Sequence, residues 1–293
     1  MEIKNSFKID SHVHIYTSYL DKRWEPGPRD LETFTKEFSK RGLNASTLTN
    51  FNDERYELFI ETAKNLPKGW DFKEYKRGAI VTMPDKTDPN GNKFYWFKSQ
   101  EIPTEKGHVL FLGTLKGKHI KPFKSLEETL KKADPLNTIV ADHAEAVLSG
   151  INPLGIGIKN LLRYKKYFHA AEWNSSCWFL FPESNKRIEK LCKEENIPLI
   201  ANSDSYGFTL PLIGGFPFYG VGNTFTEFEK GELDLTEIDH FLYSLNKNII
   251  SNNFNIQTSR ANIPSMIEHA ILAISYSRLK RLGFNIKHHC DKK

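Results

Sequence analysis

Two histidines near the start of the chain have the spacing of metal ligands. His12 and His14 lie in the segment 8–14, whose residues predict a short strand. Alternate side chains of a strand share one face, so both imidazoles point the same way and are close enough to bind one ion. Imidazole nitrogen suits zinc, manganese and iron. Such a pair also occurs by chance on surface strands, so a metal site requires further ligands.

Other acidic and imidazole side chains follow later predicted strands, and each has a purely structural explanation when taken alone. His108 could begin a strand, His143 could be a buried histidine bonded to a carbonyl, and Asp204 could cap a turn. Glu172 could pair with a lysine on an outer face. Together they predict a metal site at one rim of a sheet, formed by these strand ends: Thr49-Asn50-Phe51-Asn52, Glu101 with His108, His143, Glu172-Trp173-Asn174 and Ser203-Asp204-Ser205-Tyr206.

Alternating strands and helices predict how these residues meet. The expected strands are 8–14, 43–51, 107–115, 138–143, 167–174, 198–204 and 221–228, and the expected helices are 30–42, 53–66, 125–132, 183–195, 236–246 and 264–282. The stretch 78–104 predicts a β-hairpin, and its aromatic run Phe94 to Phe97 favours hairpin packing, with stacking on a base as the alternative. The alternation predicts a parallel sheet with covering helices, and the number of units favours a barrel.

Composition indicates one globular α/β domain, 1–293, with a C-terminal helical extension from about residue 232. A length of 293 residues suits one core. The net charge of +5 is spread over scattered lysines and the C-terminal tail, which is more typical of a solvated surface than of nucleic-acid binding. The three cysteines have no CxxC spacing, and no segment has the features of a signal peptide or a membrane span. We therefore expect a cytoplasmic protein with free thiols and no membrane partner.

The ordered series of motifs resembles the PHP family, the polymerase-and-histidinol-phosphatase superfamily of metal-dependent phosphoesterases. The resemblance runs from about residue 9 to 228. It rests on Asp10-Ser11-His12-Val13-His14, on the segment 41–52, on Glu101 to His108, on Val140-Ala141-Asp142-His143 and on Ser203-Asp204-Ser205-Tyr206. It implies an α/β fold in the form of a distorted (β/α)7 TIM-like barrel, the PHP fold, with metals at its rim.

The same resemblance implies a ligand set. The first ion would be held by His12, His14, Glu101 and Asp204, and the second by His108 and His143 with Glu101 bridging both. Glu101, Asp204 and His143 would carry the catalytic chemistry. The mixture of imidazole and carboxylate suits manganese, zinc or iron better than calcium.

Departures from the family pattern remove donors of a third ion. Phe51 stands where the family has a histidine, and Tyr206 stands where a second one follows Ser-Asp. No further histidine follows His14 in the first loop, where only Asp21 could bind. Phenylalanine has no donor atom and neutral tyrosine is a poor ligand, so we expect two divalent ions per chain.

The resemblance implies a phosphoesterase that hydrolyses a phosphomonoester or a nucleotide-like phosphate by means of a hydroxide activated by two metals. Candidate phosphate-binding cations are Lys106, Lys118, Arg163 and Arg260. One alternative is a PHP-like domain that has lost catalysis and serves as a metal-binding or regulatory module. Another is an exonuclease or phosphodiesterase on nucleic-acid ends, although no concentrated basic groove supports it. The sequence leaves the oligomeric state open.

Overall fold

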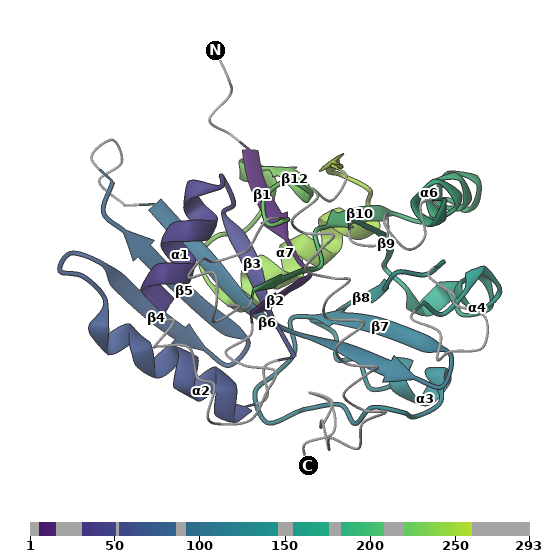
Figure 1. Ribbon diagram of the computed structural model, residues 1–293, viewed down its shortest axis with the longest axis horizontal. Helices are drawn as coiled ribbons and strands as arrows, with labels where there is room; N and C mark the ends of the chain where they lie inside the picture. The colour runs from purple at the N-terminus through teal and green to yellow at the C-terminus, as the bar shows by residue number, and fades with distance from the viewer. Residues whose placement is uncertain are drawn as a thin grey trace, which may run out of the picture.

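A strongly curved sheet of eleven strands forms the centre of the protein in the computed structural model, which describes residues 6–15, 31–50, 53–85, 92–145, 155–175, 183–207 and 220–259 (Figure 1). The strands follow the order β10 (Leu199–Asn202), β9 (Ala170–Asn174), β8 (Thr138–Ala141), β7 (Gly107–Leu112), β6 (Asn92–Thr104), β3 (Ala45–Thr49), β1 (Ser6–Asp10), β12 (Phe225–Glu229) and β13 (Asn255–Gln257). Beside this path, β5 (Gly78–Met83) pairs with β6, and β4 (Asp71–Tyr75) pairs with β5. A second, two-stranded sheet joins β2 (Val13–Ile15) to β11 (Ser205–Gly207).

The sheet curls into a nearly closed barrel, and one threonine joins its distant strands. Thr226 of β12 accepts a hydrogen bond from the Ala201 amide of β10 at 3.0 Å. The same hydroxyl donates to the Ala201 carbonyl at 3.2 Å. Strand β12 therefore fills the space between β10 and β1. The predicted α/β barrel is confirmed.

Strand direction departs from the prediction of a parallel sheet. Pairing is parallel from β1 through β3 to β6 and again from β8 through β9 to β10, but β7 is antiparallel to both of its neighbours. The physical reason is the tight turn at residues 105–106, which joins β6 directly to β7 and leaves no chain for a crossover helix. The beginning of β7 consequently lies at the rim where the neighbouring strands end.

Helices cover the outside of the barrel on two sides (Figure 1). On one side, α1 (Leu31–Lys40), α2 (Asp53–Glu61) and the 3-10 turn η1 (Thr62–Asn65) lie over an apolar cluster that includes Phe38, Trp96 and Val81. On the other side, α3 (Leu126–Leu130), α4 (Ile158–Arg163) and α6 (Ser184–Glu195) cover a cluster that includes Phe111 and Ile188. Both clusters bury the outward faces of the strands. No helix in the described ranges is both long and apolar enough to span a membrane.

The interior of the barrel has its own apolar core. Phe97, Leu112 and Ile200 point inward from β6, β7 and β10 and pack with Phe241 and Leu245 of α7 (Ile238–Ile250). This core fills the interior and the end of the barrel at which most strands begin. The polar side chains gather at the other rim, where those strands end.

The aromatic run in β6 is a packing element. Phe94 and Trp96 face outward, with ring centroids 4.8 Å apart, whereas Tyr95 and Phe97 face inward against Phe241. All four side chains of the run are at most 1% exposed. These buried side chains are not available to stack on a nucleic-acid base. The structure therefore shows the first of the two predicted alternatives, packing within the hairpin.

Most predicted elements are present with shorter bounds. The Oγ atom of Ser125 accepts a hydrogen bond from the Glu128 amide at 3.2 Å and begins α3 as predicted. The predicted strand 167–174 starts later, because Lys165–Tyr167 form the 3-10 turn η2. Strands β4 and β13 and the 3-10 turn η3 (Lys230–Glu232) were not predicted. Phe51, Cys177, Cys290 and the helix expected at 264–282 lie outside the described residues.

Candidate metal centre

All of the side chains predicted to bind metal meet at one rim of the barrel. They come from β1–β2, from the hairpin of β6 and β7, and from the residues that follow β8 and β10. Together with two further carboxylates they form what we call the rim cluster: His12, His14, Glu101, His108, Asp142, His143, Glu172 and Asp204. All of its members except His108 are buried.

One set of donor atoms surrounds the Nε2 atoms of His12 and His14. These two nitrogens are 3.0 Å apart, and each lies 3.4 Å from Oδ1 of Asp204. Oε2 of Glu101 lies 3.3 Å from Nε2 of His14. Ligands about 2.1 Å from one ion are about 3.4 Å apart in a tetrahedron and about 3.0 Å apart in an octahedron. The spacing of this set therefore matches the coordination sphere of one small cation.

A second set begins at the other oxygen of the same glutamate. Oε1 of Glu101 lies 2.5 Å from Nδ1 of His108 and 3.3 Å from Nε2 of His143. His108 reaches this position because β7 is reversed, so its first residues lie opposite the last inward residues of β6. The carboxylate of Glu101 thus lies between the two donor sets, with one oxygen directed at each.

Backbone conformation at the rim brings several of these residues inward. Asn50, His143 and Asp204 follow β3, β8 and β10 and have φ angles of 61°, 31° and 48°. Positive φ is uncommon outside glycine, although asparagine, aspartate and histidine adopt it more readily than other residues. At each of these residues the chain turns away from the direction of the preceding strand. Asn50 also secures Glu101, because its Oδ1 accepts the Glu101 amide at 2.9 Å.

Charge within the rim cluster shifts its pKa values strongly. Burial alone would lower the pKa of His12, but Asp204, Asp142 and Glu172 raise it well above its usual value. Burial would likewise raise the pKa of Glu101, but the neighbouring His108 and its hydrogen bonds to histidines hold it well below. The cluster therefore favours ionised carboxylates beside imidazoles.

Asp142 shows that the donor set fits a cation. Burial raises the pKa of this carboxyl to about 6 even though His143 and His12 oppose the shift. Neither of its oxygens accepts a hydrogen bond from any residue that the structure describes. Within those same residues, Glu101, Asp142 and Glu172 form ion pairs with histidines and with no lysine or arginine. A buried group of carboxylates whose ionic partners are imidazoles is typical of a site for a cation.

Asp142 was not predicted as a member of the site, and Glu172 was predicted at the rim but not in the ligand set. Glu172 faces inward and contacts His12 rather than a lysine on the outer face. The alternation of Glu172 and Asn174 in β9 was a usable signal for this orientation. Asp142 had none, because alternation places it opposite His143, and only the left-handed backbone at His143 brings both inward.

The remaining predicted residues lie elsewhere or outside the described ranges. Lys118 lines a small pocket with Lys98 and His119, on the face of β6 opposite Glu101. The guanidinium of Arg163 lies 5.3 Å from the ring centroid of Tyr164. Asp21, Phe51 and Arg260 are outside the described residues, and for Tyr206 the structure describes only the backbone, which pairs with His14 in β2.

The comparisons with known proteins concern the fold. No protein-family model matches the sequence, and no curated protein matches it. The structure is similar to that of PsfC from Pseudomonas syringae PB-5123, with a TM-score of 0.56 and 17% identity over 94% of this chain and 99% of that one. This likeness shows a shared fold.

A second solved structure is that of a two-domain protein containing a predicted PHP-like metal-dependent phosphoesterase from Bacteroides vulgatus ATCC 8482. Its TM-score is 0.47 at 13% identity, over 86% of this chain and 64% of that one. Independently of these comparisons, the rim of this chain holds a His/Asp/Glu cluster compatible with metal binding.

Proposed function

We propose that this protein is a PHP-type metal-dependent phosphoesterase that hydrolyses a phosphomonoester or a nucleotide-like phosphate. The observation that carries the proposal is the position of Glu101, whose two oxygens face two separate sets of imidazole and carboxylate donors. A carboxylate in this position can hold two cations about 3.5–4 Å apart, which is the spacing of two-metal hydrolytic sites.

In this proposal the donor sets hold two divalent ions. His12, His14, Asp204 and Glu101 bind the first, and His108, His143 and Glu101 bind the second. When bound, the ions supply Lewis acidity that activates water and neutralises charge on a phosphoryl group. The mixed nitrogen and oxygen donors favour manganese, zinc or iron.

Charge balance supports two ions. Glu101, Asp142, Glu172 and Asp204 contribute four negative charges when ionised, and two divalent cations would neutralise them. The imidazoles can then remain neutral, which is the form that binds a metal.

The exposed edge of the cluster indicates where a substrate enters. The side chain of His108 is 19% exposed, whereas those of His12 and His14 are fully buried. A phosphoryl group would therefore approach over His108, and the first donor set would lie deeper and exclude bulk water.

Metal content and hydrolysis test the proposal together. Elemental analysis of the purified full-length protein should find about two ions per chain. After reconstitution with manganese or zinc, the protein should hydrolyse p-nitrophenyl phosphate or a mononucleotide, and a chelator should abolish this activity. Asp204→Asn should remove a ligand of the first ion together with the activity. Two firmly bound ions without turnover of a broad panel of phosphomonoesters, diesters and oligonucleotides would instead identify a metal-binding module.

A further inference from the structure

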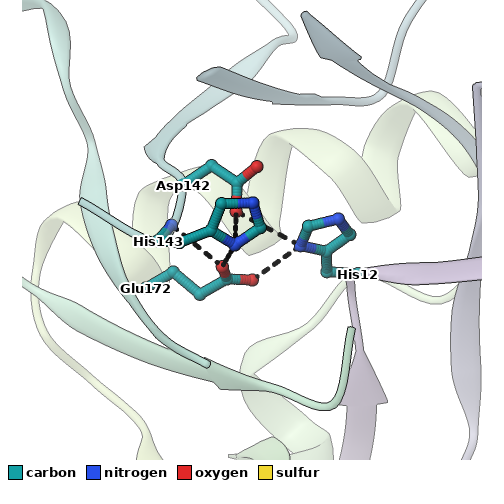
Figure 2. Close-up of side chains that lie close together, drawn as sticks. All are labelled: His12, Asp142, His143 and Glu172. Carbon is teal, nitrogen blue, oxygen red and sulfur yellow. Dashed lines mark hydrogen bonds and ion pairs between the residues drawn. The ribbon is translucent and has the colours of Figure 1, made fainter. Parts of the chain in front are cut away.

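The imidazoles of His12 and His143 present their second nitrogens to a pair of buried carboxylates. The two rings are stacked, with centroids 5.6 Å apart (Figure 2). Nδ1 of His12 lies 2.9 Å from Oε1 of Glu172, and Nδ1 of His143 lies 2.9 Å from Oδ1 of Asp142. Cross contacts of 3.4 Å and 3.6 Å join each ring to the other carboxylate. Both Nε2 atoms point away from this pair, toward the donor sets that contain Glu101.

We propose that Glu172 is a positioning residue that keeps the proton of the His12 ring on Nδ1, through the hydrogen bond of 2.9 Å between Nδ1 and Oε1. A neutral imidazole has one N–H group and one lone pair, so a carboxylate acceptor at Nδ1 directs the lone pair to Nε2. The inference rests on the proposed function, because Nε2 is the atom that binds a cation there. It assigns a role to a buried carboxylate that the two metal-binding sets leave unused.

Glu172 is itself held in place by two asparagine side chains. Asn202 donates from Nδ2 to Oε1 of Glu172 at 2.9 Å. Nδ2 of Asn174 donates to Oε2 of Glu172 at 2.8 Å and to Oδ2 of Asp204 at 3.2 Å. The same Nδ2 atom lies 2.8 Å from Nδ1 of His143, so this hydrogen-bond network also links Glu172 to the second ring.

An alternative arrangement is that His12, Asp142, His143 and Glu172 bind a cation themselves. Their donor atoms all lie within 4.8 Å of one another. A neutral ring cannot bind cations through both nitrogens, so binding at Nδ1 would exclude His12 from the donor set of His14 and Asp204. Nε2 of His12 lies 3.0 Å from Nε2 of His14 and 3.4 Å from Asp204. This denser set favours Nε2 as the binding atom and Nδ1 as the hydrogen-bond donor.

The experiment replaces Glu172 by its amide in the full-length protein. The side-chain amide of Glu172→Gln can donate a hydrogen to Nδ1 of His12 and stabilise the opposite tautomer. We expect manganese or zinc to bind 10–100-fold more weakly by titration calorimetry. Stoichiometry at saturation should remain two. Nitrogen-15 spectra of the metal-free protein, recorded at a pH above the raised pKa of His12, should show loss of the Nδ1–H tautomer of this ring.

Glu145→Gln is the matched control. Glu145 lies three positions beyond Asp142 but forms its ion pair with Arg187 on α6, so neither metal affinity nor tautomer should change. Wild-type affinity and an unchanged His12 tautomer in Glu172→Gln, with circular dichroism showing an intact fold, would overturn the proposal. Loss of one whole ion at saturation would also overturn it and would assign Glu172 as a direct ligand. Failure of phosphoester hydrolysis by the wild-type protein would count against the proposed function and leave the tautomer result interpretable.

Discussion

Two polar clusters flank the same strand, β6, one buried at the rim and one partly exposed, and they differ in how their charges are compensated. On the inner side, Glu101 faces the rim cluster. On the outer side, Lys98 donates to Oδ1 of Asp53 at 2.9 Å and lies 4.7 Å from the ring centroid of Tyr56. The other oxygen of Asp53 accepts the Gly117 amide at 2.9 Å. This outer cluster, Asp53, Lys98, Gln100 and His119, is complete without a ligand.

The difference shows how a structural cluster can be distinguished from a binding site. In the outer cluster an ammonium group matches a carboxylate, and Gln100 satisfies both its oxygen and its amide through Ile120. In the rim cluster the ion pairs that the structure describes for the buried carboxylates are all with imidazoles, and Asp142 accepts no hydrogen bond within the described residues. Burial of uncompensated charge is costly unless something neutralises it. We infer that the rim cluster is built for cations and that the outer cluster stabilises the fold.

The largest expected effect follows from removing the charge of Glu101. Glu101→Gln keeps the shape of the side chain but removes a negative charge and one of the two bridging donors. We expect the affinity for the two ions to fall by about 100-fold or more, and hydrolysis to fall with it. Titration of the chelator-treated protein with manganese measures this loss. Retention of both ions and of full turnover would show that Glu101 does not bridge the two ions.

The second prediction is that the free energy of unfolding changes with pH in opposite directions in the metal-free and the metal-bound protein. Burial raises the pKa of Asp10 to about 7 and that of Asp142 to about 6. The unfolded chain ionises these groups near pH 4, so the metal-free folded protein binds more protons and loses stability as pH rises. The raised pKa values of His12 and His14 act in the same direction, because their stabilisation is complete below about pH 6.5 and is lost above it.

Metal binding should reverse that slope. Cations and protons compete for the same donors, so bound metal stabilises the protein increasingly as pH rises. Urea unfolding at several values between pH 5 and 8, with chelator and with manganese, should therefore give a falling series and a rising series. The free energy of unfolding should change by a few kcal/mol in the metal-free series. Two series of the same slope would show that the rim cluster does not bind the ion.

The third prediction tests the outer cluster. Lys98→Met keeps most of the apolar side chain but removes the ammonium group, which lies over the Tyr56 ring and pairs with Asp53. The side chain of Asp53 is 40% exposed and can hydrate. We expect the free energy of unfolding to fall by about 1–2 kcal/mol, with no change in metal stoichiometry or affinity. Denaturant unfolding and metal titration of the same preparation separate the two effects. A loss of metal would show that the two sides of β6 are coupled.

Much of the fold and of the donor set could be predicted from the sequence, for identifiable reasons. Period-two alternation placed His12 beside His14, and the order of strand ends brought Glu101, His143 and Asp204 to one rim. The direction of β7 could not be predicted from the sequence, because a strand that precedes a hairpin turn has a residue pattern similar to one that precedes a crossover connection. Asp142 was missed because a positive φ at the next residue breaks the alternation on which the argument depended. Tertiary packing sets such local backbone conformations, and a pattern of residue types along the sequence does not reveal them.

The smallest expected effect compares two asparagines with the same backbone conformation. Asn50 at the rim has a φ of 61°, and the exposed Asn196, which ends α6, has a φ of 52°. Glycine adopts both conformations without strain. Asn196→Gly should therefore leave the free energy of unfolding within about 0.5 kcal/mol of the wild type. Asn50→Gly should lower it by about 1–3 kcal/mol, because the buried Glu101 amide loses its acceptor.

The same pair also bears on metal binding. Asn50 holds the backbone of Glu101, so Asn50→Gly should weaken metal affinity several-fold, whereas Asn196→Gly should not. Asn50→Asp keeps an acceptor oxygen and should recover part of the stability, although it adds a negative charge beside Glu101. Equal stability of the two glycine variants would mean that the backbone turn alone, and not the hydrogen bond to Glu101, explains asparagine at position 50. The rim would then be organised by its charged residues only.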